Sequence, residues 1–138
     1  MSKKTISQIM KNNPITLQCH TSLTDIVKTL ISSQQSQLPV VNNEKKLLGM
    51  VSLVGCQKAL LSSAYHCDKP VQVDNVMAID FNTFNADEDL SEVAIKTQHL
   101  SDNIFPVVKG DKLIGIMKRT DLLTHLQNNL SLCSQKQL

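Results

Sequence analysis

Apolar and polar positions along this chain follow one succession of patterns, and that succession occurs twice. Between residues 23 and 31 the apolar side chains recur at intervals of three and four, which is typical of one face of an α-helix. Two short apolar runs at 38–41 and 47–53 follow, and the turn between them predicts a β-hairpin. A closing helix is expected to begin near Gly55. The apolar helical positions are Leu23, Ile26, Val27, Leu30 and Ile31, and Thr21 or Ser22 is the expected N-cap.

The second occurrence is an internal repeat of the first. Leu38-Pro39-Val40-Val41 returns as Phe105-Pro106-Val107-Val108 after 67 positions, and 47–51 returns as 113–117 after 66. The missing residue falls in the hairpin turn. Each copy also opens with a short helix (5–10 and 73–77) and a brief extended segment, and the second copy closes with a helix from about Thr120. We therefore predict repeats at 3–65 and 70–128, followed by a Ser- and Gln-rich tail at 129–138 that is either frayed or a helical extension.

These elements predict an α+β fold. A small sheet with helices on one side leaves its other face uncovered, and one copy of about 60 residues buries little apolar surface by itself. We expect two β-α-β-β-α repeats packed sheet to sheet with pseudo-twofold symmetry, leaving two equivalent clefts.

Composition excludes several classes of function. A net charge of +2, three Phe, one Tyr and no Trp supply neither a basic stripe nor stacking rings for nucleic acid. No apolar run approaches the roughly 20 residues of a membrane span, and the N-terminus does not read as a signal peptide, so a cytoplasmic protein is expected. The four cysteines are expected to be free thiols and the four histidines surface residues. No metal site, required cofactor or catalytic motif is recognised, so we do not expect an enzyme.

The duplicated order of helix, strand, helix, hairpin and helix, with the two Pro-Val-Val strands, resembles the cystathionine β-synthase (CBS) domain pair, or Bateman module. The resemblance covers roughly residues 3–128. It implies a regulatory module that binds AMP, ADP, ATP or S-adenosylmethionine between the repeats and that commonly forms dimers. No effector domain is recognised on this chain, so the resemblance leaves either a separate effector protein or the dimer itself as the output.

The family's binding motif follows the second hairpin strand as Gly, two hydrophobic residues, Ser or Thr, two further residues and Asp. In the second copy this is 115–121, which makes Asp121 the implied acceptor for the ribose hydroxyls, with Thr120 beside it. Lys118 stands where Ser or Thr is usual, so it would either supply a phosphate charge or block the cleft. In the first copy Ser52 keeps the hydroxyl but Gly55 replaces the aspartate, so one competent site is expected.

The family's cleft joins the closing motif of one copy to the opening segment of the other. The implied phosphate contacts are Lys118 and Arg119, with Lys11 as a further candidate, and the implied base contacts come from the opening segment and the Pro-containing strands. The complete set of implied ligand-binding residues is Asp121, Thr120, Lys118, Arg119, Met117, Thr16, Ile15, Pro14, Leu38, Gln37, Asn103 and Ile104, with Asn13 adjacent.

Two readings of these residues stay open. Asp121 begins an apolar helix and is equally suited to be its N-cap, and charged residues such as Lys118 and Arg119 also occur on solvated edges. The leading hypothesis is a dimeric module that senses an adenosine-containing nucleotide and modulates a partner protein. The alternative is an interaction or scaffold protein that keeps the CBS-pair fold without a ligand, which Gly55 and Lys118 favour.

Overall fold

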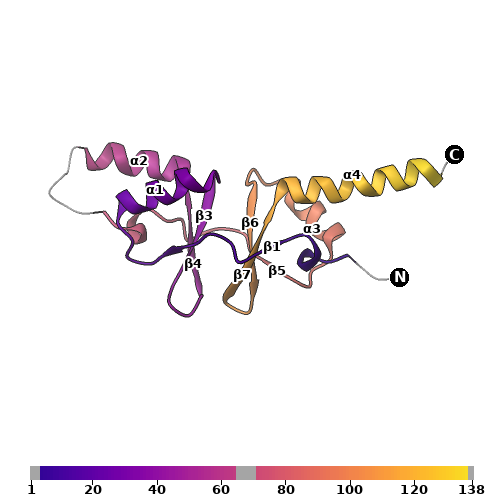
Figure 1. The fold of residues 1–138 in the computed structure, drawn as a ribbon, viewed down its shortest axis with the longest axis horizontal. Helices are drawn as coiled ribbons and strands as arrows, with labels where there is room; N and C mark the ends of the chain where they lie inside the picture. Colours follow the sequence, from indigo (N-terminus) through magenta and orange to yellow (C-terminus); the bar gives the residue numbers. More distant parts are fainter. Residues whose placement is uncertain (1–3, 65–70, 137–138) are drawn as a thin grey trace. The chain divides into compact units, whose positions relative to one another are not determined.

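A computed structural model describes residues 4–64 and 71–136 of the 138-residue chain (Figure 1). The described residues form two compact units. Unit 1 comprises the described parts of Met1–Asn13, Thr83–Gly110 and Ile114–Leu138, and unit 2 comprises those of Pro14–Asn82 and Asp111–Leu113. Each unit therefore contains the body of one sequence repeat together with the opening segment of the other.

Unit 2 is built on a three-stranded sheet in the order β2-β3-β4, with β2 at Leu17–Gln18, β3 at Gln37–Val41 and β4 at Leu47–Ser52. β2 runs parallel to β3, and the β3–β4 hairpin is antiparallel with an irregularity between Val40 and Val41. Helices α1 (Leu23–Ser33) and α2 (Leu53–Ser63) lie side by side in this unit (Figure 1). The opening segment of the second repeat, with the short 3₁₀ helix η2 (Val73–Asn75), completes it.

Unit 1 repeats this plan with a four-stranded sheet in the order β1-β7-β6-β5. Its strands are β1 (Lys11–Asn12), β5 (Phe84–Asn85), β6 (Ile104–Lys109) and β7 (Lys112–Lys118). β5 runs parallel to β6, and β1 runs antiparallel to β7. The helices are η1 (Ile6–Gln8), α3 (Leu90–Thr97) and α4 (Arg119–Lys136). α4 shows that the predicted tail is a helical extension as far as Lys136.

The two hydrophobic cores use equivalent positions, which confirms the repeat read from the sequence. Unit 1 buries Ile6, Phe84, Leu90, Val93, Phe105, Val107, Met117 and Leu122. At the offsets of 67 and 66, seven of their equivalents lie in the core cluster of unit 2, namely Val73, Leu17, Ile26, Leu38, Val40, Val51 and Cys56. The eighth, Leu23, is also buried. At the same offset, the polar Thr97 is the equivalent of the apolar Leu30. Thr97 can be buried because its hydroxyl donates a hydrogen bond to the Val93 carbonyl at 2.8 Å.

Opening segments are exchanged through backbone hydrogen bonds. In unit 1 the Ile6 amide donates to the Glu88 carbonyl and the Leu90 amide to the Lys4 carbonyl. Unit 2 has the equivalent pair, from Leu23 to Val71 and from Val73 to Thr21. Two bonds in each unit, with lengths of 2.8–3.1 Å, thus tie the opening segment of one repeat to the helix start of the other.

Helix starts agree in part with the sequence predictions. Of the two expected N-caps, Ser22 is the one that caps α1, by accepting a hydrogen bond from the Asp25 amide. α2 begins at Leu53, two residues earlier than expected, because the Ser52 hydroxyl accepts from the Gly55 amide at 3.0 Å. Ile31 does not belong to the buried face of α1, since 67% of its surface is exposed.

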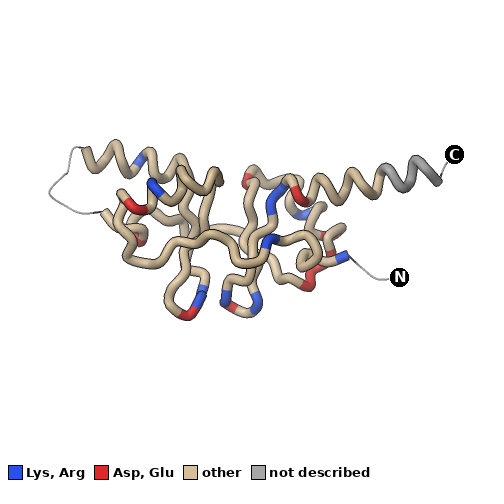
Figure 2. The backbone as a smooth tube through the Cα atoms, in the orientation of Figure 1, with Lys and Arg blue, Asp and Glu red and all other residues tan. Residues whose placement is uncertain are grey.

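Charged residues gather in the turns of both hairpins (Figure 2). The Asn42 side chain organises the first turn by accepting hydrogen bonds from the Glu44 and Lys46 amides. Gly110 takes a positive φ of 67° in the second turn. Among the helices of the described ranges, none has the combination of length and hydropathy that a membrane span requires.

Candidate functional site

The predicted binding motif begins where β1 pairs closely with β7. Lys11 pairs with Ile116 and Asn12 with Gly115. A Cβ atom on Gly115 would lie 2.6 Å from the Lys11 carbonyl oxygen, so only glycine allows this approach. The same close approach occurs in unit 2, where a Cβ on Gly49 would lie 2.8 Å from the Ala78 carbonyl oxygen. The motif glycine therefore holds the opening segment of one repeat against the closing strand of the other.

Asp121 lies in the first turn of α4, at the third helical position. α4 begins at Arg119, and the Asp121 carboxylate accepts a hydrogen bond from the Lys118 backbone amide at 3.4 Å. In the alternative reading Asp121 is the N-cap residue; the structure instead has Lys118 before the helix, although the Asp121 carboxylate does accept a hydrogen bond at the helix start. A single long hydrogen bond leaves most of the carboxylate's acceptor capacity free for another group.

Next to Asp121, a hollow of about 270 Å³ opens between α4 and the end of η1. It is lined by Ile9, Asp121, Thr124, His125 and Asn128. The three residues beyond Asp121 follow it at intervals of three, four and seven, so one face of α4 supplies them all. Polar groups dominate this lining. The hollow offers a hydrogen-bonding surface beside the carboxylate.

Lys11 and Lys118 form a second feature at the same edge of unit 1. The neighbouring Lys11 amine, together with partial burial, lowers the pKa of Lys118. The Asp121 carboxylate acts in the opposite direction and raises this pKa. Two lysines and one carboxylate thus come together at the start of α4.

Arg119 has a role different from the predicted phosphate contact. Its guanidinium donates to the carbonyls of Thr97, Leu100 and Asp102, and it lies 5.4 Å from the centroid of the Phe105 ring. Its Nε also donates to the Asn103 side chain at 3.3 Å. With these donors engaged, Arg119 holds the loop between α3 and β6.

Met117 is also placed differently from the prediction. Its side chain is fully buried in the core of unit 1, so it faces the helices and not a ligand. Ile104 is 5% exposed, whereas Asn103 and Thr120 are exposed. Of the predicted residues in unit 1, the structure therefore brings together Lys118 and Asp121, with Lys11 beside them.

Five predicted residues belong to unit 2. Leu38 is a core residue of that unit, and Gln37 is half-buried at the start of β3. Pro14 and Thr16 are half-buried and Ile15 is 49% exposed in the extended segment before β2. Asn13, which ends the segment of unit 1, has a positive φ of 52°, a conformation that asparagine tolerates better than most residues.

The equivalent edge of unit 2 carries none of these charges. Ser52 stands in the place of Lys118 and Gly55 in the place of Asp121. Ala78, bridged to Met50, stands in the place of Lys11, which pairs with Ile116. The same backbone arrangement thus forms in both units, with a charged edge in one and an uncharged edge in the other.

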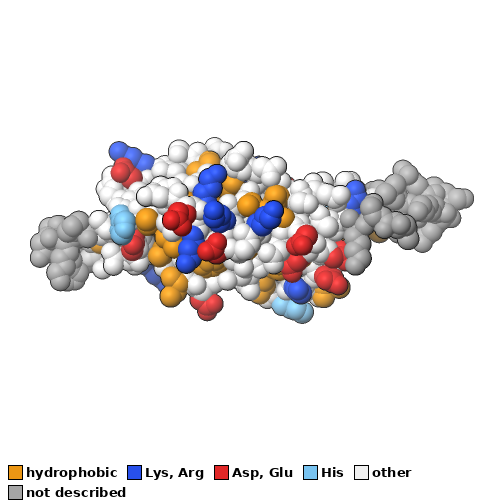
Figure 3. All heavy atoms as spheres, turned by 90° about the horizontal axis from the view of Figure 1, so that it is seen from below, with side chains coloured by type: hydrophobic (Ala, Val, Ile, Leu, Met, Phe, Trp, Pro, Cys, Tyr) orange, Lys and Arg blue, Asp and Glu red, His pale blue; other side chains and the backbone are white. Residues whose placement is uncertain are grey.

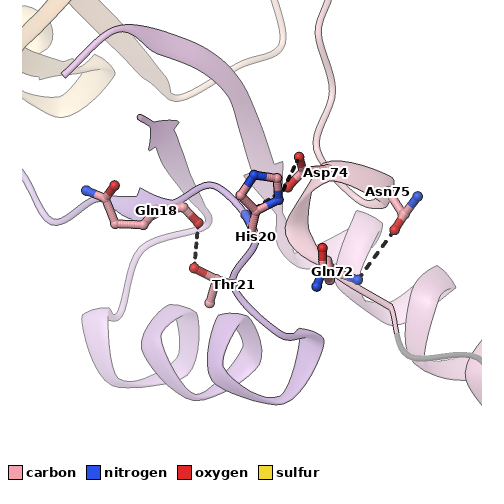
Figure 4. A network of polar contacts seen from close by, with 6 residues as sticks. All are labelled: Gln18, His20, Thr21, Gln72, Asp74 and Asn75. Atoms are coloured by element: carbon pink, nitrogen blue, oxygen red, sulfur yellow. Dashed lines mark hydrogen bonds and ion pairs between the residues drawn. The ribbon is translucent and has the colours of Figure 1, made fainter. Parts of the chain in front are cut away.

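Unit 2 instead has a polar network around η2 (Figure 4). The His20 backbone amide donates to Asp74 at 2.9 Å, and the imidazole Nδ1 lies 3.5 Å from the other carboxylate oxygen. The Thr21 hydroxyl donates to the Gln18 carbonyl, and the Gln72 amide donates to Asn75. His20 is exposed, so this network fastens η2 at the surface.

No group of three metal-ligating side chains occurs within 4–64 and 71–130, the ranges in which side chains are described; His66 and Cys67 lie outside those ranges. Cys19 and Cys56 are free thiols, and burial raises the pKa of Cys56. Cys67 is also outside the described residues, as is the side chain of Cys133. On the face shown in Figure 3, acidic and basic side chains are interspersed, without a stripe of one sign.

Sequence reasoning missed most of the hollow. His125 was expected at the surface but is half-buried, and Thr124 and Asn128 were not among the predicted site residues. Their helical spacing from Asp121 is the signal that could have found them. Lys11 was a further candidate, and the pairing of β1 with β7 explains its position.

Comparison with known proteins gives the family. The profile of the CBS domain matches residues 6–62 and 73–128. A solved structure described as an acetoin utilization protein (AcuB) from Vibrio cholerae is 29% identical with a TM-score of 0.81, and the match covers 97% of this chain and 98% of that one. A CBS domain pair solved in complex with 5′-methylthioadenosine and S-adenosyl-L-methionine is 25% identical with a TM-score of 0.76, over 93% of this chain and 99% of that one.

Curated relatives are much longer proteins. The A-adding tRNA nucleotidyltransferase of Aquifex aeolicus is 28% identical over 93% of this chain, and the homoserine O-acetyltransferase of Methanococcus vannielii is 25% identical over 91%. The chain spans only 15% and 25% of their respective lengths. The match is therefore to one region of each enzyme. With both repeats matched by the family profile and both units sharing one fold, the chain belongs to the CBS domain family and carries a tandem pair of CBS domains.

Proposed function

We propose that this chain is a regulatory module that binds an adenosine-containing ligand at the Asp121 edge of unit 1. The observation that carries the proposal is the Asp121 carboxylate beside a polar hollow of about 270 Å³ at the start of α4. A carboxylate has two acceptor oxygens, which suits the two hydroxyls of a ribose. The solved CBS pair with two bound adenosine derivatives supports this choice of ligand class.

The proposed role is regulatory and not catalytic. Binding would act through differential affinity, because a ligand shifts a conformational equilibrium only by as much as it prefers one state. The ligand is therefore an input that is read by a partner, and no cofactor is required.

Titration calorimetry of the full chain with AMP, ADP, ATP, S-adenosylmethionine and methylthioadenosine tests the proposal. We expect at least one to bind, and Asp121→Ala to weaken that binding about a hundredfold, since two hydrogen bonds to a charged acceptor contribute roughly 3 kcal/mol. Asp89→Ala is the matched control. It removes a carboxylate that caps α3 in the same unit, and it should leave ligand affinity unchanged. Absence of binding by every ligand, with the fold intact, contradicts the proposal.

A second copy of this chain is the partner that we propose for the helical surface of unit 2. α1 and α2 leave an apolar groove of about 350 Å³ between them, and the exposed side chains that flank it include Ile31, Leu53, Leu60 and Leu61. In unit 1, α4 exposes Leu126, the equivalent of Leu60, together with Leu123 and Leu130. Because the helices of both units expose apolar side chains, pairing of two copies would bury the apolar helical surfaces of one copy against those of the other. This surface also supports the alternative function, an interaction protein without a ligand.

A further inference from the structure

Pairing of β1 with β7 brings Lys11 and Lys118 onto one face of the sheet in unit 1. Lys11 lies directly opposite Ile116, and side chains two positions apart on a strand point to the same face. Lys118 is therefore the diagonal neighbour of Lys11, at a separation that long side chains bridge. The register thus makes the two lysines neighbours, and the Lys11 amine is close enough to lower the pKa of Lys118.

Such a meeting of two cations is unfavourable unless another charge compensates for it. The groups that face the Lys118 amine are Lys11 on β1 and Asp121 on α4. One carboxylate cannot balance two ammonium groups, so the cluster has an excess of positive charge when both lysines are protonated. The lowered pKa of Lys118 reflects this excess. An anion placed here would relieve it.

The fold itself does not require these charges. In unit 2 the three equivalent positions are Ala78, Ser52 and Gly55, and the strand register and the helix start form without them. There the N-cap hydroxyl of Ser52 begins the helix. In unit 1 the N-cap position is instead given to a lysine, and Asp121 accepts the hydrogen bond from its backbone. The hydrogen bond at the helix start of unit 1 is therefore accepted by the Asp121 side chain, so the side chain at the N-cap position is not needed for capping. The Lys118 amine is then free to lie beside Lys11.

We propose that the Lys11–Lys118 pair makes the Asp121 site selective for ligands that carry phosphate, so that nucleoside phosphates bind and uncharged or cationic adenosine derivatives are disfavoured. This inference rests on the proposed function. It narrows the ligand class to nucleotides such as AMP, in which Asp121 accepts from the ribose and the two ammonium groups face the phosphate. S-adenosylmethionine, which is a sulfonium cation, would add a positive charge to a cluster that already has an excess.

The inference also fixes the sign of the pH dependence. A phosphate beside Lys118 favours the protonated amine and so raises the pKa of Lys118. At any pH at which the free protein has an unprotonated Lys118, binding of the phosphate is therefore coupled to the uptake of a proton. Affinity for a nucleotide is therefore greatest below the lowered pKa of Lys118 and falls as the pH rises through that value. An uncharged nucleoside should show no such fall.

The test compares AMP with adenosine, which has the same base and ribose but no phosphate, by calorimetry on the full chain. We expect AMP to bind at least tenfold more tightly than adenosine. Lys118→Ser and Lys11→Ala install the residues found at the equivalent positions of unit 2, and each should weaken AMP binding about tenfold without changing adenosine binding. Lys109→Ala removes an exposed lysine elsewhere in unit 1 and should change neither.

The outcomes separate this inference from the proposed function. If adenosine or S-adenosylmethionine binds as tightly as AMP, and Asp121→Ala abolishes that binding, the function stands and phosphate selectivity is refuted. Equal losses for AMP and adenosine in the lysine variants also refute it. If none of the ligands binds to the folded protein, both proposals fall. Thermal unfolding of each variant shows that the fold persists, which the native serine cap of α2 leads us to expect for Lys118→Ser.

Discussion

Replacing Arg119 with alanine should destabilise unit 1 through a loop that lies well away from Asp121 in the sequence. The guanidinium donates to the Thr97 carbonyl at the end of α3 and to those of Leu100 and Asp102 in the following loop. The last carbonyls of a helix have no partner within it, and an arginine can supply one. In unit 2 α1 ends differently, with Gln34 in a left-handed conformation at φ 59°. Arg119 therefore ends α3 by donating to its last carbonyl, whereas α1 is ended by a residue in the left-handed conformation.

The magnitude follows from the bonds lost. Hydrogen bonds from a charged donor contribute about 1.5–3 kcal/mol each when buried, and these carbonyls are only partly buried, so about 1 kcal/mol for each of the three is appropriate. The contact with the Phe105 ring adds roughly 0.5 kcal/mol. We expect Arg119→Ala to lower the free energy of unfolding by about 3 kcal/mol. Arg119→Lys should recover less than half of this, because one ammonium group cannot reach all three carbonyls.

Urea unfolding followed by circular dichroism measures the loss, and hydrogen exchange locates it. Amides of α3 should exchange faster in Arg119→Ala while those of α1 keep their rates. Leu53→Ala is the matched control, since Leu53 is the equivalent residue of unit 2, is 49% exposed, and should cost less than about 1 kcal/mol. A change within 0.5 kcal/mol of the wild type for Arg119→Ala would refute the reasoning. Loss of nucleotide binding without loss of stability would restore the phosphate role predicted from the sequence.

Two further predictions concern the close pairing of β1 with β7 and the helical surface of unit 2. Gly115→Ala should destabilise the protein by roughly 2 kcal/mol and weaken ligand binding, because the new Cβ would collide with the Lys11 carbonyl oxygen. In the control, Gly110→Ala, the new Cβ contacts no other atom, so the variant should lose only about 1 kcal/mol, for the positive φ of this residue. Urea unfolding measures the stability of both variants, and calorimetry measures their ligand binding. Leu60→Glu should halve the mass measured by light scattering if two copies pair through α1 and α2, with Glu92→Lys at an exposed position of α3 as the control. A wild-type monomer would rule out that pairing.

Much of the fold was predictable because each helix and strand of the first repeat has an equivalent sequence pattern in the second repeat. A single Pro-Val-Val strand is a weak signal, but Leu38 and Phe105 at one offset, and Gly49 and Gly115 at the next, reveal one structure read twice. The core positions follow from the same offsets. Helix starts were less predictable, since a serine at the end of a strand and a serine that caps a helix have the same sequence pattern, as Ser52 shows.

The candidate site was predictable only in part. The spacing of the motif places Asp121 correctly at the start of a helix, but it says nothing of where a long side chain turns. Arg119 and Met117 lie in the same motif, and the structure turns one toward the carbonyls of a loop and the other into the core. Lys11 meets Lys118 through strand pairing across more than a hundred residues, which spacing alone does not encode.

Exchange of the opening segments means that neither sequence repeat by itself contains all the residues of one compact unit. A fragment cut between the two repeats would lack the segment that donates to, and accepts from, its own helix start. Two such fragments mixed together could complete each other, and two copies of one fragment could do the same by reciprocal exchange. Within one polypeptide the two edges are encoded separately, and here one carries Lys11, Lys118 and Asp121 while the other carries Ala78, Ser52 and Gly55.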